Sequence, residues 1–139
     1  MFKTMSTILL VISLITPGYT SERYSSPDLS EYYQSLNQPD NPSNSCCGAG
    51  DAYYADKVKD CPVDASDCAL IAIITDTRPD TFKLPDDKII NRPHVDPGTE
   101  VVIPKSKIRK KPIPNPTEHN IVFMNRYNSV LCWEPGAGI

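Results

Sequence analysis

Four of the five cysteines lie within residues 45–68, SCCGAGDAYYADKVKDCPVDASDC, and two of them, Cys46 and Cys47, are adjacent. The fifth, Cys132, lies close to the C-terminus. Thiols can form disulfides, bind a metal ion or act as nucleophiles, so this cluster is the first candidate for chemistry. Because five is an odd number, full pairing within one chain is impossible, and one thiol is left over or joins another molecule.

Disulfide formation is the favoured use of these cysteines. Cys61 and Cys68 flank a turn-rich hexapeptide, and a bond between them would close a ring worth about 2.5 kcal/mol in the chain-entropy model. A second bond, from Cys46 or Cys47 to Cys132, would close a long loop worth about 4.5 kcal/mol. The predicted disulfide cysteines are therefore Cys61, Cys68, Cys47 and Cys132, with Cys46 open as the other partner for Cys132.

Cys47 is also a candidate nucleophile. In papain-like cysteine hydrolases of the cell wall, a cysteine opens a helix, a Gly-Asp-hydrophobic strand follows, and a histidine opens a later strand. The order Cys47, residues 98–102 and His119 resembles this arrangement, although Thr99 stands where the acid is expected. The resemblance implies His119 as the base and Glu134 as the group that orients it, acting on peptidoglycan or a peptide. This hydrolase is the alternative to a structural role.

A metal site is the third possibility for these residue types. His94 and His119 are the only histidines, and no pair of potential ligands has the short spacing of a zinc motif. The aspartates between residues 60 and 87 include no D-x-D-x-D-G stretch of the kind that binds calcium. We therefore expect no metal and no cofactor.

A basic run, KSKIRKK, occupies residues 105–111 of a chain whose net charge is -3. If the run is extended, alternate side chains share one face and could meet an anionic cell-envelope polymer or a protein. The residues on that face are Lys105, Lys107, Arg109 and Lys111. The alternative is a solvated connector whose lysines discourage strand pairing. Nucleic acid is not an expected partner, because the chain is slightly acidic and is predicted to be exported.

The N-terminus predicts export. Lys3 is followed by the apolar run ILLVISLI at residues 8–15, which is typical of a signal peptide over residues 1–20. A run of eight residues is too short to span a bilayer, which takes about 20, and no second such run follows. We expect a periplasmic or secreted protein with no transmembrane segment in the mature chain. Such compartments let disulfides persist.

The elements that must position these groups are short. Residues 21–45 are expected to form a helix and a linker: a serine cap and Pro27 start a helix over residues 25–36, and residues 37–45 read as a loop. The fourteen prolines of the chain disfavour long helices. Predicted strands cover residues 69–74, 88–90, 100–103, 120–125 and 130–133. Residues 46–139 are thus one disulfide-stapled domain, mainly β (α+β), with a small antiparallel sheet or partly open barrel and one N-terminal helix.

Several short motifs resemble those of a family of small uncharacterised exported bacterial proteins. They are SCC followed by Asp51, IP..KI at residues 103–108, NPT at residues 115–117 and CW.P at residues 132–135. In that family a cysteine often follows the aspartate, whereas here Ala52 does. The resemblance implies an exported single domain and carries no known activity. The function expected from the sequence is a non-enzymatic envelope or extracellular binding or structural module.

Overall fold

The computed structural model describes residues 27–83 and 87–136. The predicted signal peptide, residues 1–20, lies outside the described residues. In the described part of the chain, no helix has the length and apolar character needed to cross a membrane.

Helix α1 (Pro27–Ser35) agrees with the predicted helix, whose first two residues lie outside the described range. Proline suits the first helical position because its backbone angle is already helical and it has no N–H to satisfy. Tyr32 and Leu36 are buried and lie four residues apart, one on the helix and one just beyond it, so they point the same way into the core.

The segment after α1 was predicted to be a loop, and this prediction is wrong. β1 (Asn37–Gln38) and β2 (Asn41–Ser45) pair as a small antiparallel hairpin. Asn, Pro and Ser are poor strand formers, so the residue types of this segment do not predict the pairing. The backbone N–H of Cys46 donates to the Leu36 carbonyl at 2.9 Å, which brings the two ends of the hairpin together.

Two three-stranded antiparallel sheets form most of the fold. The first has the order β10-β9-β3, in which β9 and β10 confirm the strands predicted at residues 120–125 and 130–133 and pair across a short turn. The second has the order β4-β5-β8. Their strands are β3 (Asp51–Tyr54), β9 (Ile121–Met124), β10 (Val130–Glu134), β4 (Lys57–Lys59), β5 (Leu70–Ile73) and β8 (Glu100–Ile103).

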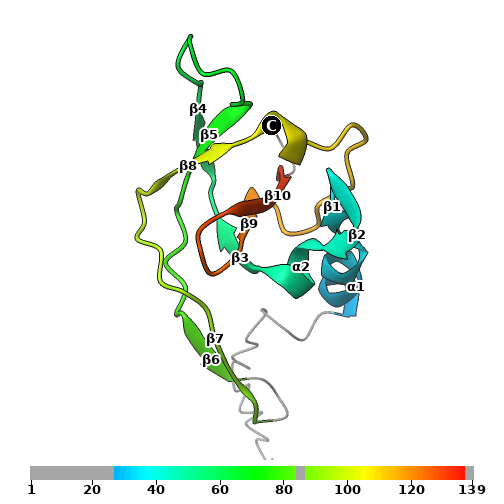
Figure 1. Cartoon of the computed structure of the whole chain (residues 1–139). Coiled ribbons are helices and arrows are strands. Elements are labelled where there is room, and N and C mark those ends of the chain that lie inside the picture. Colours follow the sequence, from blue (N-terminus) through cyan, green and yellow to red (C-terminus); the bar gives the residue numbers. More distant parts are fainter. Residues whose placement is uncertain (1–26, 84–86, 137–139) are drawn as a thin grey trace, which may run out of the picture.

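Strand β9 is the centre of the core and is buried on both faces. Val122 and Met124 point towards β5 and β8, where Ala72 and Ile103 belong to the same apolar cluster. On the other face, Ile121 and Phe123 pack with Tyr32, Leu36 and the Cys46–Cys132 pair. Figure 1 shows the resulting layers, with the β4-β5-β8 sheet on one side of β9 and α1 on the other.

A second hairpin, β6 (Thr81–Lys83) with β7 (Ile89–Asn91), projects away from these layers (Figure 1). β7 confirms the strand predicted at residues 88–90, shifted by one residue. Among the described residues the strands thus form four separate antiparallel sheets and no closed barrel, and the fold is mostly β, as predicted. The remaining elements are α2 (Cys46–Ala49) and the 3-10 helix η1 (Lys105–Lys107).

We expect Gly50→Ala to lower the free energy of unfolding by about 1–3 kcal/mol, the usual cost of overpacking. A Cβ at Gly50 would lie 2.6 Å from the Met124 carbonyl oxygen, which is part of the sheet and cannot move aside cheaply. Urea unfolding monitored by Trp133 fluorescence measures the effect.

Gly48→Ala is the matched control for this substitution. Its Cβ would meet nothing nearer than the Ser45 Cβ at 3.4 Å, an ordinary contact. Because Gly48 is helical, alanine should leave stability unchanged or raise it by up to about 1 kcal/mol. Equal midpoints for the two variants would contradict the close packing of Gly50.

Candidate functional site

The structure pairs Cys46 with Cys132 and Cys61 with Cys68, and leaves Cys47 free and exposed. The predicted Cys61–Cys68 ring is confirmed, and the assignment of Cys47 to Cys132 is wrong. The reason is local geometry. Ser45 caps α2 by accepting a hydrogen bond from the Gly48 N–H at 3.0 Å, and successive helical side chains point about 100° apart. Cys46 therefore faces the core, while Cys47 faces outwards.

Cys47 lines an open cleft of about 390 Å³ between α2 and the turn that joins β9 to β10. Partial desolvation of the sulfur, and next the negative charge of Asp51, raise the pKa of this thiol above its ordinary value. An activated nucleophile needs the opposite shift, because the thiolate is the reactive form. The surroundings of Cys47 therefore keep it protonated and weakly reactive at neutral pH.

His119 lies far from this cleft. It precedes the start of β9, whereas Cys47 lies beside the turn that follows the end of β9, so the length of the strand separates the two side chains. Its Nδ1 is 2.8 Å from an Asp56 carboxylate oxygen, and its ring stacks on Tyr54 at 4.0 Å. His119 thus takes part in folding contacts at the opposite end of the sheet.

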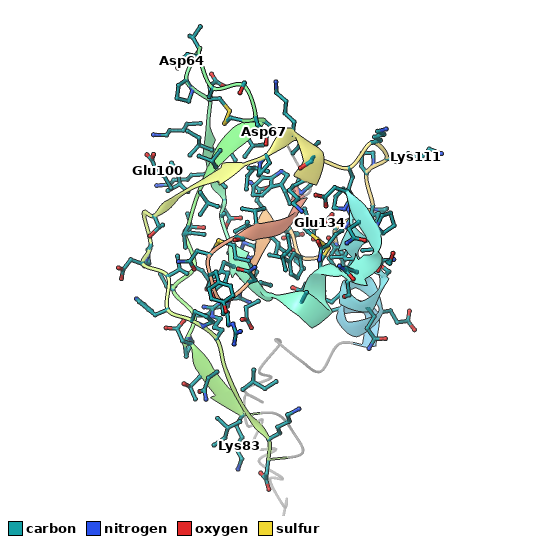
Figure 2. The ribbon with its side chains drawn as sticks, viewed as in Figure 1. Asp64, Asp67, Lys83, Glu100, Lys111 and Glu134 are labelled. Atoms are coloured by element: carbon teal, nitrogen blue, oxygen red, sulfur yellow. A yellow bond between two sulfur atoms is a disulfide. The ribbon has the colours of Figure 1, made fainter. Side chains whose placement is uncertain are left out.

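Glu134, the third member of the predicted hydrolase set, is buried at the centre of the molecule (Figure 2). Its Oε1 accepts a hydrogen bond from Arg109 Nε at 2.6 Å. Burial raises the pKa of Glu134 above its ordinary value, and Arg109 pulls in the other direction. The structure does not bring Cys47, His119 and Glu134 together, so the hydrolase alternative would require a rearrangement of the sheet.

The predicted cationic face has a different geometry from the one expected. Residues Lys105–Lys107 form a 3-10 helix, so the run is not extended. Lys107 is mostly buried and its Nζ is 2.8 Å from both carboxylate oxygens of Asp40. Arg109 is occupied by Glu134, and its Nη2 is also 3.5 Å from Cys46 Sγ. Lys105 and Lys111 are exposed, as is their neighbour Lys110.

A buried ionic cluster that the sequence did not reveal lies along the outer edge of β3. Asp76 Oδ2 accepts hydrogen bonds from the Tyr54 backbone N–H, from Arg78 Nη2 at 2.6 Å and from Arg92 Nη1 at 2.8 Å. Both arginines also donate to the Ala52 carbonyl. Side chains thus satisfy the backbone groups of β3 that no neighbouring strand reaches, which is a way of protecting a sheet edge.

The electrostatics of this cluster follow from its contacts. Burial alone would raise the pKa of Asp76, but the hydrogen bonds from Arg78 and Arg92 outweigh burial and hold the pKa well below its ordinary 3.8. The Arg78 guanidinium also lies 3.6 Å from the centre of the Tyr54 ring, whose other face carries His119. No pattern in the sequence distinguishes Asp76 from the other aspartates between residues 60 and 87.

His94 connects this cluster to the surface. Its two ring nitrogens lie near the carboxylates of Asp80 and Asp96, and Asp80 also accepts from Arg92 Nε at 3.2 Å. Across the described residues, no group of three or more His, Cys, Asp or Glu side chains is arranged to hold a metal ion.

Comparison with known proteins found no matching family model, no matching curated protein and no matching solved structure. The resemblance to small exported bacterial proteins therefore stays a prediction.

Proposed function

We propose that this protein is an exported, non-enzymatic module that binds a polyanionic polymer of the cell envelope through Lys105, Lys110 and Lys111. The single observation that carries the proposal is the way the basic segment is held. Lys107 and Arg109 point inwards to Asp40 and Glu134, and this anchoring leaves the other three basic side chains exposed on one short segment. Figure 2 shows Lys111 pointing away from the molecule.

The anchoring suits binding to a charged polymer. A segment that is already fixed in the free protein loses less conformational entropy on binding. Flexible ammonium groups match the repeating charges of a polymer without demanding one geometry. Two disulfides within the described residues also suit an oxidising compartment, which is where such polymers occur.

The expected result is salt-sensitive cosedimentation with insoluble cell wall that carries teichoic acid. Each lysine near an anionic surface contributes about 1 kcal/mol, so a variant with Lys105, Lys110 and Lys111 replaced by Gln should bind about a hundredfold more weakly. Cell wall stripped of teichoic acid is the reference for the contribution of polymer charge. Binding should also weaken steeply as the salt concentration rises.

A charge-matched control replaces Lys57, Lys59 and Lys83 with Gln. These lysines are exposed on β4 and β6, and their removal changes the net charge by the same amount. The control should retain most of the binding. Equal loss in both variants would assign the effect to net charge and overturn the role of the basic segment. No sedimentation of the wild type with any wall preparation would overturn the proposed function.

A further inference from the structure

His94 is held between two carboxylates, one at each ring nitrogen. Nδ1 lies 2.5 Å from Asp80 Oδ2, and Nε2 lies 2.8 Å from Asp96 Oδ1. An ionised carboxylate only accepts hydrogen bonds, so each ring nitrogen must carry a hydrogen and donate a hydrogen bond to its partner. Only the charged imidazolium carries a proton on both nitrogens. Both hydrogen bonds are therefore made together when His94 is protonated and the two carboxylates are ionised.

The two carboxylates belong to different parts of the fold. Asp80 directly precedes β6, and its carbonyl accepts the Arg92 N–H at 2.9 Å, which closes the base of the β6–β7 hairpin. Asp96 begins the turn that leads into β8, where its carbonyl accepts the Thr99 N–H at 3.1 Å. The imidazolium of His94 thus joins the base of the projecting hairpin to the turn in front of the β4-β5-β8 sheet.

We propose that His94 is a proton-controlled clamp that sets the position of the β6–β7 hairpin. Neutral imidazole has a single N–H, so it can donate to only one of the two carboxylates. The other ring nitrogen would then present a lone pair to the second carboxylate, and that contact opens. The hairpin keeps its Arg92 anchor and its backbone connection through residues 92–95, and it loses the side-chain link from Asp80 through His94 to Asp96.

The described contacts of the hairpin with the rest of the fold lie at its base, where Arg92 is its buried anchor. A two-stranded hairpin is marginally stable by itself in water. Ile89 on β7 is 63% exposed, so this side chain contributes little packing. The position of the hairpin therefore depends on the contacts at its base, of which the His94 clamp is one.

The groups around His94 define the direction of the pH dependence. Asp80 and Asp96 face the ring, Arg92 and Asp76 lie behind Asp80, and the Tyr53 hydroxyl donates to the carbonyl of neighbouring Pro93. The hydrogen bond to Asp80, followed by the one to Asp96, raises the pKa of His94 above 6.5. The clamp is therefore closed in mildly acidic solution, below pH 6.5, and opens as the pH rises through the raised pKa.

Nuclear magnetic resonance of the full chain tests the clamp between about pH 5.5 and pH 9. We expect the His94 ring signals to titrate with a midpoint above 6.5, and the backbone amide shifts of Thr81–Lys83 and Ile89–Asn91 to change with the same midpoint. Asp96→Asn, an exposed change that leaves the Asp76 cluster intact, should move both midpoints to lower pH together.

His94→Gln is the decisive variant, because glutamine stays neutral throughout this range. It should abolish the pH dependence of the hairpin amides, and the matched His119→Gln variant should leave that dependence unchanged. A His94 midpoint at or below 6.5 would overturn the proposal. Hairpin amides that still titrate in the His94→Gln variant would overturn it as well. These outcomes do not depend on polymer binding, so they are separable from the proposed function.

Discussion

Replacing Asp76 with asparagine should lower the free energy of unfolding by about 3–5 kcal/mol, the typical cost of breaking a buried ion pair by removing one partner. The Asp76 side chain is 1% exposed and receives both Arg78 and Arg92. The substitution keeps the shape of the side chain but leaves two largely buried guanidinium groups without their counter-charge. The same change weakens the support of the β3 edge, because the amide cannot accept as many hydrogen bonds as the carboxylate.

Urea unfolding of the wild type and the Asp76→Asn variant measures this effect. An equal slope of unfolding free energy against urea concentration would show that both proteins expose the same surface when they unfold. Asp64→Asn is the matched control, because Asp64 is exposed at the tip of the Cys61–Cys68 ring (Figure 2). The control should change stability by less than about 0.5 kcal/mol. A similarly small effect at Asp76 would mean that the arginines find other partners, and the proposed role of the cluster would be wrong.

The contribution of Asp76 should also depend on pH in a defined direction. Because the folded protein holds the pKa of Asp76 below its ordinary 3.8, the stabilisation is present above about pH 4 and is lost as the pH falls further. The difference in stability between the wild type and the Asp76→Asn variant should therefore be constant from about pH 5 to pH 7. It should shrink on acidification below about pH 4. A difference that grows in acid would contradict the shift.

Removing the Cys46–Cys132 disulfide with the double substitution Cys46→Ala and Cys132→Ala should cost about 4.5 kcal/mol. The bond joins residues 86 apart in the sequence, so it restricts the unfolded chain strongly. Its two cysteines are fully buried between α1 and β9, where alanine would also leave a small cavity. Much of the net stability of a domain this size, about 5–15 kcal/mol, would be lost.

The matched comparison is the double substitution Cys61→Ala and Cys68→Ala. These residues are only seven apart, and the same model predicts a cost of about 2.5 kcal/mol. Chemical unfolding of both variants gives the two values. If removing Cys61–Cys68 costs more stability than removing Cys46–Cys132, then the Cys46–Cys132 disulfide is not what holds α1 and the hairpin β1–β2 to the sheet.

Alkylation without reduction, followed by digestion and mass spectrometry, should first establish the pairing. Cys47 should be the single labelled cysteine, and labelling should be slow at neutral pH because the thiol pKa is raised. A label on Cys46 would mean that Cys47 pairs with Cys132. Fast labelling at mildly acidic pH would mean that the thiol is activated, and the hydrolase alternative would return.

The adjacent cysteines show why the pairing needed the structure. Sequence spacing allowed either Cys46 or Cys47 to reach Cys132, because the two differ by one residue in a loop of more than eighty. The choice depends on the direction of each side chain. Ser45 begins α2 and thereby turns Cys46 towards β10, where Cys132 lies opposite Phe123 on the α1-facing side. Which of the two sulfurs lies within reach of Cys132 is therefore decided only when α2 packs on the sheet.

What the sequence determined by itself is local. A continuous apolar run predicted β5, and short stretches of β-branched and other apolar residues predicted β8, β9 and β10, because these side chains favour strands. Proline placement predicted α1, and the short Cys61–Cys68 spacing predicted its ring, because each depends on residues close together in the chain.

Tertiary structure decided the contacts between distant segments. The pairing of β3 with β9 leaves backbone groups of Ala52 and Tyr54 at an open sheet edge. Asp76, Arg78 and Arg92 together form hydrogen bonds with these groups. The same packing turns Arg109 towards Glu134 and places His119 away from Cys47. The residues next to a charged side chain in the sequence do not indicate its ion-pair partner. The interaction energy depends on burial and on which opposite charge the fold brings close to it.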